Sequence, residues 1–171
     1  ALLKALLDSN IENACFGPII DPQAVAELQS YPLGAQVNIS LGGKTEPKMG
    51  GAPLQVEAQI LWQGSGLLIG TGPIIGGLKK DHGETVVLKI QDIEVLVVSI
   101  AHQMLDLSQF ETFGIDPKAK SVVALKSMQH FRAAFVPIAS KVIVCDSGAL
   151  CTLDYKVLDY QKVPRPISPW I

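Results

Sequence analysis

The stretch TVVLKIQDIEVLVVSI, residues 85–100, decides the fold of this chain. It holds two β-branched, apolar runs, 85–90 and 93–100, which are separated only by Gln91 and Asp92. Valine and isoleucine favour β-strands, and a two-residue connection is the commonest link between antiparallel strands. The stretch therefore predicts a β-hairpin in the middle of the chain.

The residues before this hairpin extend the predicted sheet. Apolar and polar residues alternate over 35–41 and 54–62, which is typical of half-buried strands. A turn is expected at 64–66, after which residues 67–70 would return antiparallel. The segment 42–53 is rich in glycine and proline and is expected to be a loop. The middle third of the chain is thus predicted to be an antiparallel meander.

Helices and strands alternate toward the N-terminus. Residues 1–10 have helical apolar spacing, and 13–20 form an apolar strand candidate. Asp21 and Pro22 then have the preferred order for a helix start, which predicts a helix over 21–31. Because no cap residue or turn signal precedes the first helix, we expect the chain to begin inside a longer polypeptide.

The last third of the chain shows the same alternation. A short helix is expected over 106–113, followed by a strand at 121–125, a helix at about 129–139 and a strand at 141–146. These three last elements predict a β-α-β unit near the C-terminus. The fold class is therefore α/β with α+β character: a mixed β-sheet with flanking helices in one domain over residues 1–171.

Composition excludes several classes of partner. The formal net charge is -2 with no basic block, so nucleic acid is not expected. No apolar run approaches the roughly 20 residues of a membrane-spanning helix. The 48% hydrophobic content leaves apolar surface for a domain interface or a homo-oligomer. Three cysteines without a C-x-x-C pair indicate a reducing compartment, which we take to be the cytoplasm.

The strongest candidate site is the segment KSMQHFR, residues 126–132. It concentrates the cations Lys126, His130 and Arg132 and the hydroxyl of Ser127 between a strand and a helix, where α/β proteins build ligand sites. With Ser127 as the helix cap, the cations would repel the helix dipole, and a bound anion would offset that repulsion. The alternative is an ordinary capped helix whose cations form salt bridges within the chain.

A second candidate is the loop Gly42-Gly43-Lys44, which follows a predicted strand. Asn38 stands where a phosphate-binding loop needs glycine, so a nucleotide site is not expected. Two glycines would still allow the backbone to approach a ligand, with Lys44 beside it. A plain loop is the alternative.

No metal site is expected within the chain. The histidines His82, His102 and His130 show neither the H-E-x-x-H motif nor spacing by four. His82 lies in a charged, glycine-containing stretch and is interpreted as a residue of a solvated loop. A nucleophile elbow of the G-x-S-x-G type is also missing from the sequence.

Several short motifs, taken in order, resemble a known family. They are LGGKT at 41–45, TGP at 71–73, GGL at 76–78, FGIDP at 113–117, KS at 126–127 with HFRAAF at 130–135, and RPISP at 165–169. Together they are similar to the C-terminal region of the microcystinase-C (MlrC) metallopeptidase family.

The resemblance implies the C-terminal domain of a zinc-dependent metallopeptidase or amidohydrolase. In such a protein an N-terminal metal-binding domain holds the zinc, so this chain would carry no cofactor and would be inactive alone. Its expected work is to close one side of a cleft over a peptide or small amide, which metal-activated water would hydrolyse. Lys126, Ser127, His130, Arg132 and the loop Gly42-Gly43-Lys44 would bind substrate, while catalytic residues stay unassigned.

A rival from another class is a non-catalytic scaffold or oligomerisation domain with internally paired cations. The surroundings of Arg132 discriminate the two. A buried guanidinium on a carboxylate of this chain would favour the scaffold, and an open one would favour the substrate site.

Overall fold

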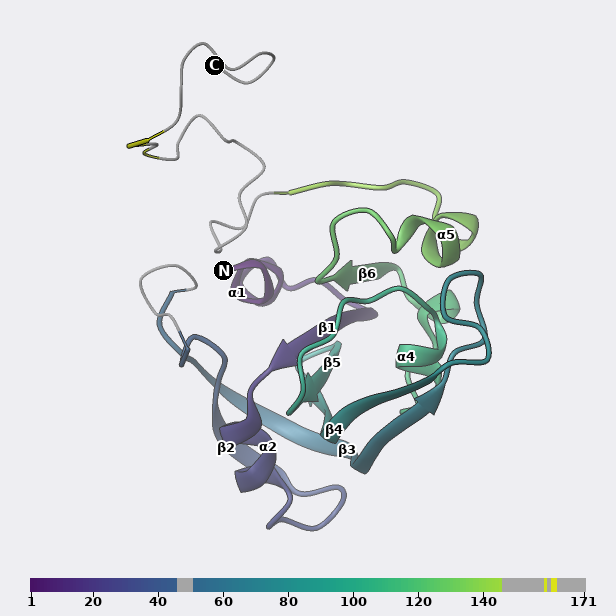
Figure 1. The fold of residues 1–171 in the computed structure, drawn as a ribbon. Coiled ribbons are helices and arrows are strands. Elements are labelled where there is room, and N and C mark those ends of the chain that lie inside the picture. Colours follow the sequence, from purple (N-terminus) through teal and green to yellow (C-terminus); the bar gives the residue numbers. More distant parts are fainter. Residues whose placement is uncertain (46–50, 146–158, 160, 163–171) are drawn as a thin grey trace.

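The computed structural model describes residues 1–45, 51–145, 159 and 161–162. Within these ranges a six-stranded mixed sheet has the strand order β2-β3-β4-β5-β1-β6 (Figure 1). Its strands are β1 Ala14–Ile20, β2 Gln36–Leu41, β3 Leu54–Ile69, β4 Lys79–Ile90, β5 Ile93–Val98 and β6 Val122–Leu125. The helices are α1 Leu2–Asp8, α2 Pro22–Leu28, α4 Ser108–Glu111 and α5 Arg132–Phe135, with 3-10 turns η1 Pro117–Ala119 and η2 Val136–Ile138.

The sheet combines an antiparallel and a parallel half. The pairs β2–β3, β3–β4 and β4–β5 are antiparallel, and Ile90 lies opposite Ile93 at the tight β4–β5 connection. Strand β1 is inserted between β5 and β6 and is parallel to both. This arrangement confirms the predicted hairpin, the meander and the α/β class with a mixed sheet.

Two apolar layers bury the central strands from both faces. Val86, Leu88 and Val95 pack with α1 and α2 on one face of the sheet. Val87 and Leu96 point to the other face and pack with aromatic residues of α4 and α5. Burial on both faces explains why these strands read as continuous apolar runs rather than as alternating ones.

The β-α-β unit lies one step earlier in the chain than the sequence predicted. Strands β5 and β6 are both parallel to β1, and the chain between them contains α4, so β5-α4-β6 forms the crossover. The strand expected at 141–146 is wrong over 141–145, which have no strand, and residue 146 lies outside the described residues. The helix expected at 129–139 is reduced to α5 and η2, with Pro137 inside the 3-10 turn. Among the helices described, none is long and apolar enough to cross a membrane.

Strand β3 is one long strand, so the turn predicted at 64–66 and the returning strand at 67–70 were wrong. Residues Gly64, Ser65 and Gly66 continue the pairing with β4 through an irregularity between Ser65 and Leu67. A Cβ atom on Gly66 would lie 2.4 Å from the carbonyl oxygen of Gly83. Glycine is therefore needed at this position for close approach of two strands, not for a reversal of the chain.

A buried carboxylate joins three elements on the α2 side of the sheet. Asp21, only 3% exposed, caps α2 by accepting a hydrogen bond of 2.9 Å from the backbone N–H of Ala24. Its other oxygen accepts from the N–H of Gly42 at 2.8 Å and from the ammonium group of Lys44 at 2.5 Å. Because Gly42 and Lys44 follow β2, this contact fastens the end of β2 to the end of β1.

Replacing Asp21 with alanine is expected to reduce the free energy of unfolding by about 2–3 kcal/mol, since the substitution removes a helix cap and leaves the partly buried Lys44 without its partner. The measurement is urea unfolding followed by circular dichroism. The matched control is Asp8→Ala, which breaks the exposed Lys4–Asp8 pair and should cost less than about 1 kcal/mol. Equal losses in the two variants would contradict the role assigned to Asp21.

Candidate functional site

The loops that follow the three parallel strands meet at one edge of the sheet. Residues 99–107 follow β5, Asp21 follows β1, and residues 126–131 follow β6. The backbone N–H of Met104 approaches the carbonyl oxygen of Lys126 at 3.5 Å, and the side-chain amide of Gln103 donates to Ser127 Oγ at 3.0 Å. Ligands of open α/β sheets bind outside the carboxyl ends of parallel strands. This edge is therefore the candidate functional site.

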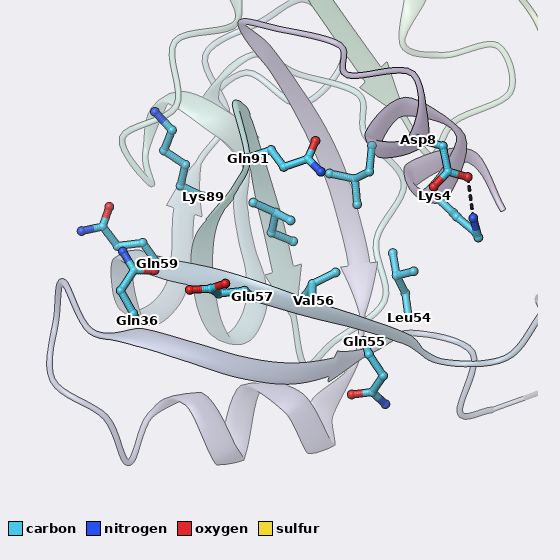
Figure 2. Close-up of a pocket in the computed structure, with 12 residues that line it drawn as sticks. Lys4, Asp8, Gln36, Leu54, Gln55, Val56, Glu57, Gln59, Lys89 and Gln91 are labelled. Atoms are coloured by element: carbon cyan, nitrogen blue, oxygen red, sulfur yellow. Dashed lines mark hydrogen bonds and ion pairs between the residues drawn. The ribbon is translucent and has the colours of Figure 1, made fainter.

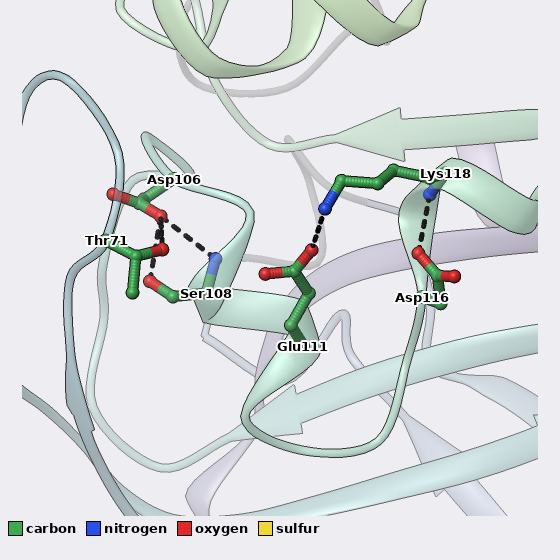
Figure 3. A network of polar contacts seen from close by, with 6 residues as sticks. All are labelled: Thr71, Asp106, Ser108, Glu111, Asp116 and Lys118. Carbon is green, nitrogen blue, oxygen red and sulfur yellow. Dashed lines mark hydrogen bonds and ion pairs between the residues drawn. The ribbon is translucent and has the colours of Figure 1, made fainter.

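Asp106 is the polar centre of this edge (Figure 3). Its carboxylate is fully buried and accepts hydrogen bonds from the backbone N–H and hydroxyl of Ser108 at 2.9 and 2.8 Å. It also accepts from the N–H of Gly72 at 2.5 Å and, at 3.4 Å, from the hydroxyl of Thr71. Because Thr71 and Gly72 belong to the β3–β4 loop, Asp106 fixes that loop beside α4.

The hydrogen bonds keep this buried carboxylate ionised. Burial would raise the pKa of Asp106, but the donors on Ser108, Gly72 and Thr71 together outweigh it and hold the pKa below its ordinary value. Figure 3 also shows an ion pair farther along the chain, in which Lys118 and Glu111 approach to 2.7 Å on the surface. That exposed pair contributes little compared with the buried network.

Gln109 connects the loop after β5 to a buried histidine. Its side-chain oxygen accepts from the N–H groups of Leu105 and Asp106 at 2.7 and 3.1 Å. Its side-chain nitrogen donates to the carbonyl of Gln103 at 3.1 Å and lies 3.2 Å from Nε2 of His82. The one amide thus holds four groups and sets the shape of the loop that contacts Ser127.

His82 is fully buried in β4, so its interpretation as a solvated loop residue was wrong. Its ring packs edge-on against His102 and Phe113, with centroids 4.8 and 6.0 Å away. Burial, and to a lesser extent the neighbouring His102, lower the pKa of His82 to about 4, and Asp81 opposes them. Its Nδ1 atom has no hydrogen-bond partner among the described residues. The ring is therefore neutral in the folded protein near pH 7.

The structure places the predicted cations at this edge but not at a capped helix. Lys126, His130 and Arg132 are exposed, and residues 126–131 form turns before α5 begins at Arg132. Ser127 does not cap a helix, because Phe131 holds the cap position without a side-chain hydrogen bond. The helix-dipole argument for an anion therefore fails, and Ser127 instead accepts from Gln103.

The Arg132 guanidinium is held in place without a carboxylate. Its Nε donates to the side-chain oxygen of Gln129 at 3.1 Å, and its carbon lies 5.3 Å from the centre of the Phe131 ring. Within residues 1–45 and 51–145 no salt bridge involves Lys126, His130 or Arg132. Arg132 is thus an exposed residue whose guanidinium is oriented by neutral neighbours.

The loop Gly42-Gly43-Lys44 is largely occupied by contacts within the chain. Lys44 donates to Asp21 and to the carbonyl of Ser40 at 2.6 Å. A Cβ atom on Gly43 would lie 2.5 Å from the carbonyl oxygen of Gly51. The two glycines have positive φ angles of 61° and 63°, which the closed loop requires.

One predicted segment contacts strand β1, and the other contacts Asp21, the residue that follows it. The N–H of Lys126 donates to the carbonyl of Gly17 at 2.9 Å, and Gly42 donates to Asp21. Gly17 and Asp21 are four residues apart, which is roughly 13 Å along an extended strand. The tertiary structure therefore brings the two segments to neighbouring positions on the same edge.

A separate groove of about 690 Å³ runs along β3, from the β4–β5 connection to the start of β3, beside α1 (Figure 2). It includes Gln91 of the β4–β5 connection, Glu57 of β3 and the exposed Lys4–Asp8 pair of α1. Gln91 precedes β5, whereas the candidate site follows it, so the groove is remote from the Asp106 network. Its open, mixed-charge lining shows no group of side chains arranged for chemistry.

The described residues do not fit a zinc ion. No group of three or more His, Cys, Asp or Glu side chains in these ranges could hold a metal. His82 and His102 lie close together, but their polar neighbours are Gln109 and the carbonyl of Asp81 rather than further ligands. Zinc prefers three or four nitrogen, sulfur or carboxylate ligands.

Sequence reasoning missed the buried network of Asp106, Gln109 and His82. Asp106 was placed at a helix start, but no local pattern revealed its partners, since Gly72 lies 34 residues away. The signal that could have found it was Thr71-Gly72-Pro73, one of the motifs of the family resemblance. A Cβ atom on Gly72 would lie 2.7 Å from the Asp106 carboxylate, which explains the glycine.

Comparisons with known proteins agree with this architecture. A sequence profile of the family described as "MlrC C-terminus" matches residues 1–162. Microcystinase C from Sphingomonas sp is 29% identical over 170 residues, which are 99% of this chain and 32% of that protein. A crystal structure from Mesorhizobium sp. BNC1, described as "Putative metallopeptidase", shares the fold with a TM-score of 0.72 at 22% identity. The match covers 81% of this chain and 28% of that one. The chain thus spans about a third of the length of the curated relative.

The buried His82 predicts a pH-dependent stability. Between pH 6.5 and about 4 the unfolded chain takes up a proton at this residue while the folded protein does not, so the free energy of unfolding falls as pH falls. His82 accounts for a loss on the order of 3 kcal/mol across this window. Urea unfolding at a series of pH values should show a shallower fall for His82→Gln. The exposed His130→Gln serves as the control for the loss of a histidine side chain, and a curve for His82→Gln parallel to that of the parent chain would refute the assignment.

Proposed function

Because this chain belongs to the MlrC C-terminus family, we propose that it is the C-terminal domain of a zinc-dependent metallopeptidase or amidohydrolase and forms one side of the substrate cleft. The substrate is a peptide or a small amide. The other partner is a metal-binding domain of the same longer protein, without which this chain is inactive. The match to a third of microcystinase C supports a division of labour between parts of a longer polypeptide.

The proposal rests on the surroundings of the Arg132 guanidinium. A guanidinium presents a planar fork of donors that matches a carboxylate, and this one is oriented by Gln129 and Phe131 without a carboxylate partner in the described ranges. A scaffold with internally paired cations would place an acidic side chain there. The open guanidinium therefore supports the substrate-binding role over the scaffold alternative.

In this proposal the segment 126–132 binds the substrate through its charge. Arg132 holds a carboxylate of the substrate, while Lys126 and His130, which are exposed on the same segment, add donors for a carboxylate or a carbonyl oxygen. Ser127 acts through its hydrogen bond with Gln103, which keeps the segment against the loop after β5. The buried Asp106 and Gln109 network supports both loops from beneath.

The loop Gly42-Gly43-Lys44 forms a neighbouring wall of the cleft. Because the space at Gly43 is filled by Gly51 of the same chain, the loop would contribute its outer backbone to this wall, and Lys44 contributes by holding the loop on Asp21 rather than as a free cation. We place the zinc in the remaining part of the longer protein, because the described residues here lack a suitable ligand set. A reducing, cytoplasmic location is also inferred, with Cys15 buried and Cys145 exposed as free thiols, and a homo-oligomer is compatible with the exposed apolar residues.

The test is the substitution Arg132→Ala in the full polypeptide that contains this chain. Its hydrolysis of short linear peptides with a free C-terminal carboxylate is compared with that of the same peptides as C-terminal amides. We expect KM to rise about tenfold or more for the carboxylate forms, as for a lost charge-assisted hydrogen bond, and to stay unchanged for the amides. The exposed Lys141→Ala is the matched control. Equal changes in KM for both peptide forms, or no change for either, would contradict the proposed role of Arg132.

A further inference from the structure

The tip of the β3–β4 hairpin exposes large apolar side chains. Leu67 and Ile69 at the end of β3 are 61% and 57% exposed, and Leu78, just before β4, is 53% exposed. Ile74 in the loop between them is 40% exposed. We call residues 67–81 the apolar finger. Apolar surface gathered in this way is typical of an interaction site rather than of a free protein surface.

The apolar side chains of the finger lie on both of its faces. Residues two apart on a strand share a face, so Leu67 and Ile69 point to one side, which they share with their cross-strand partners Asp81 and Lys79. Leu78 is joined to Gly70 by a backbone hydrogen bond of 3.0 Å and lies on the other face, with Leu68, which is buried in the core of the domain. A partner that covered Leu67, Ile69 and Leu78 would remove their exposed apolar surface from water.

The finger is also held in a fixed position. Buried Ile75 anchors its loop, and the N–H of Gly77 donates to the carbonyl of Gly70 at 2.8 Å. Asp106 binds Gly72 and Thr71 from the body of the domain. Because these contacts already order the finger in the free domain, binding a partner costs less conformational entropy, which favours association. The same contacts place the base of the finger beside the candidate site.

We propose that the apolar finger is the docking surface for the region of the longer protein that lies outside the matched third. This inference rests on the proposed division of labour between two parts of one protein. The relatives support this occupant, because this chain matches only 32% of microcystinase C and 28% of the solved chain. Docking at the finger brings the rest of the protein against the Asp106 edge, where the described residues alone do not form a metal-binding group.

A second copy of this chain is the alternative occupant. A two-fold dimer through the finger would place the same surface of each copy against itself, with Lys79 of one copy facing a different residue of the other. Crosslinks to residues 1–171 of a second copy distinguish this occupant from the region outside the matched third.

The experiment is photo-crosslinking in the source cells, with p-benzoylphenylalanine in place of Leu67 in the native protein. Glu57, exposed on the far groove, carries the same probe in the control. Mass spectrometry of the crosslinked peptides identifies the partner. We expect peptides from the region that aligns with microcystinase C outside its matched third, whether on the same or a separate chain, and the loss of this crosslink in Ile69→Ser with Ile74→Ser. Both residues are exposed, so the double variant should keep its fold.

Two results would overturn the proposal: crosslinks to residues 1–171 of a second copy, or no crosslink from Leu67 above that from Glu57. The outcome is separate from the fate of the proposed substrate site. A crosslink to the outside region together with unchanged kinetics of Arg132→Ala would keep the docking surface and remove the role of Arg132. The reverse combination would remove the docking surface alone.

Discussion

The need to satisfy buried carboxylates with donors from distant elements shapes this domain more than any single apolar contact. Asp21 is almost fully buried, and an ionised group there is tolerated only because Ala24, Gly42 and Lys44 supply donors. Those donors come from α2 and from the loop after β2. The carboxylate at the end of β1 therefore determines where a helix begins and where a strand far along the sheet must end.

Asp106 applies the same constraint on the other side of the sheet. Its oxygens are satisfied by Ser108, next to it in the chain, and by Gly72, from the β3–β4 loop. The loop cannot move without exposing a charged group to an apolar interior, which costs several kcal/mol. The finger and the loop after β5 are thus fixed relative to each other. Gln109 binds the backbone carbonyl of Gln103, and the side chain of Gln103 in turn binds Ser127. Through these contacts the segment after β6 is held to the same network.

The cations of the segment after β6 differ from the lysines of the domain that form ion pairs. Lys44 and Lys120 are mostly buried and bound to carboxylates, where they contribute to structure. Arg132 is instead oriented by an amide and an aromatic ring, which position the guanidinium but leave its charge available. A rigid support under an open charge is the arrangement that binding sites use. The proposed substrate segment and the apolar finger both depend on the Asp106 network, although they serve different partners.

Local patterns in the sequence determined much of the fold. The apolar runs at 85–100 specified β4 and β5, the alternation in 35–41 specified β2, and Asp21-Pro22 specified the start of α2, because each depends on neighbours within a few residues. Gly64 and Gly66 predict a turn that does not form, since glycine is equally suited to a tight turn and to a close approach of two strands.

Only the tertiary structure decided the insertion of β1 between β5 and β6, the burial of His82 and the partners of Asp106. The carboxylate of Asp106 and the N–H of Gly72 are 34 residues apart in the chain, so no periodicity or spacing records their contact. For the site, the sequence located the cations at the strand end. Their surroundings, which decide whether a charge is paired or open, arise only when loops from separate strands meet.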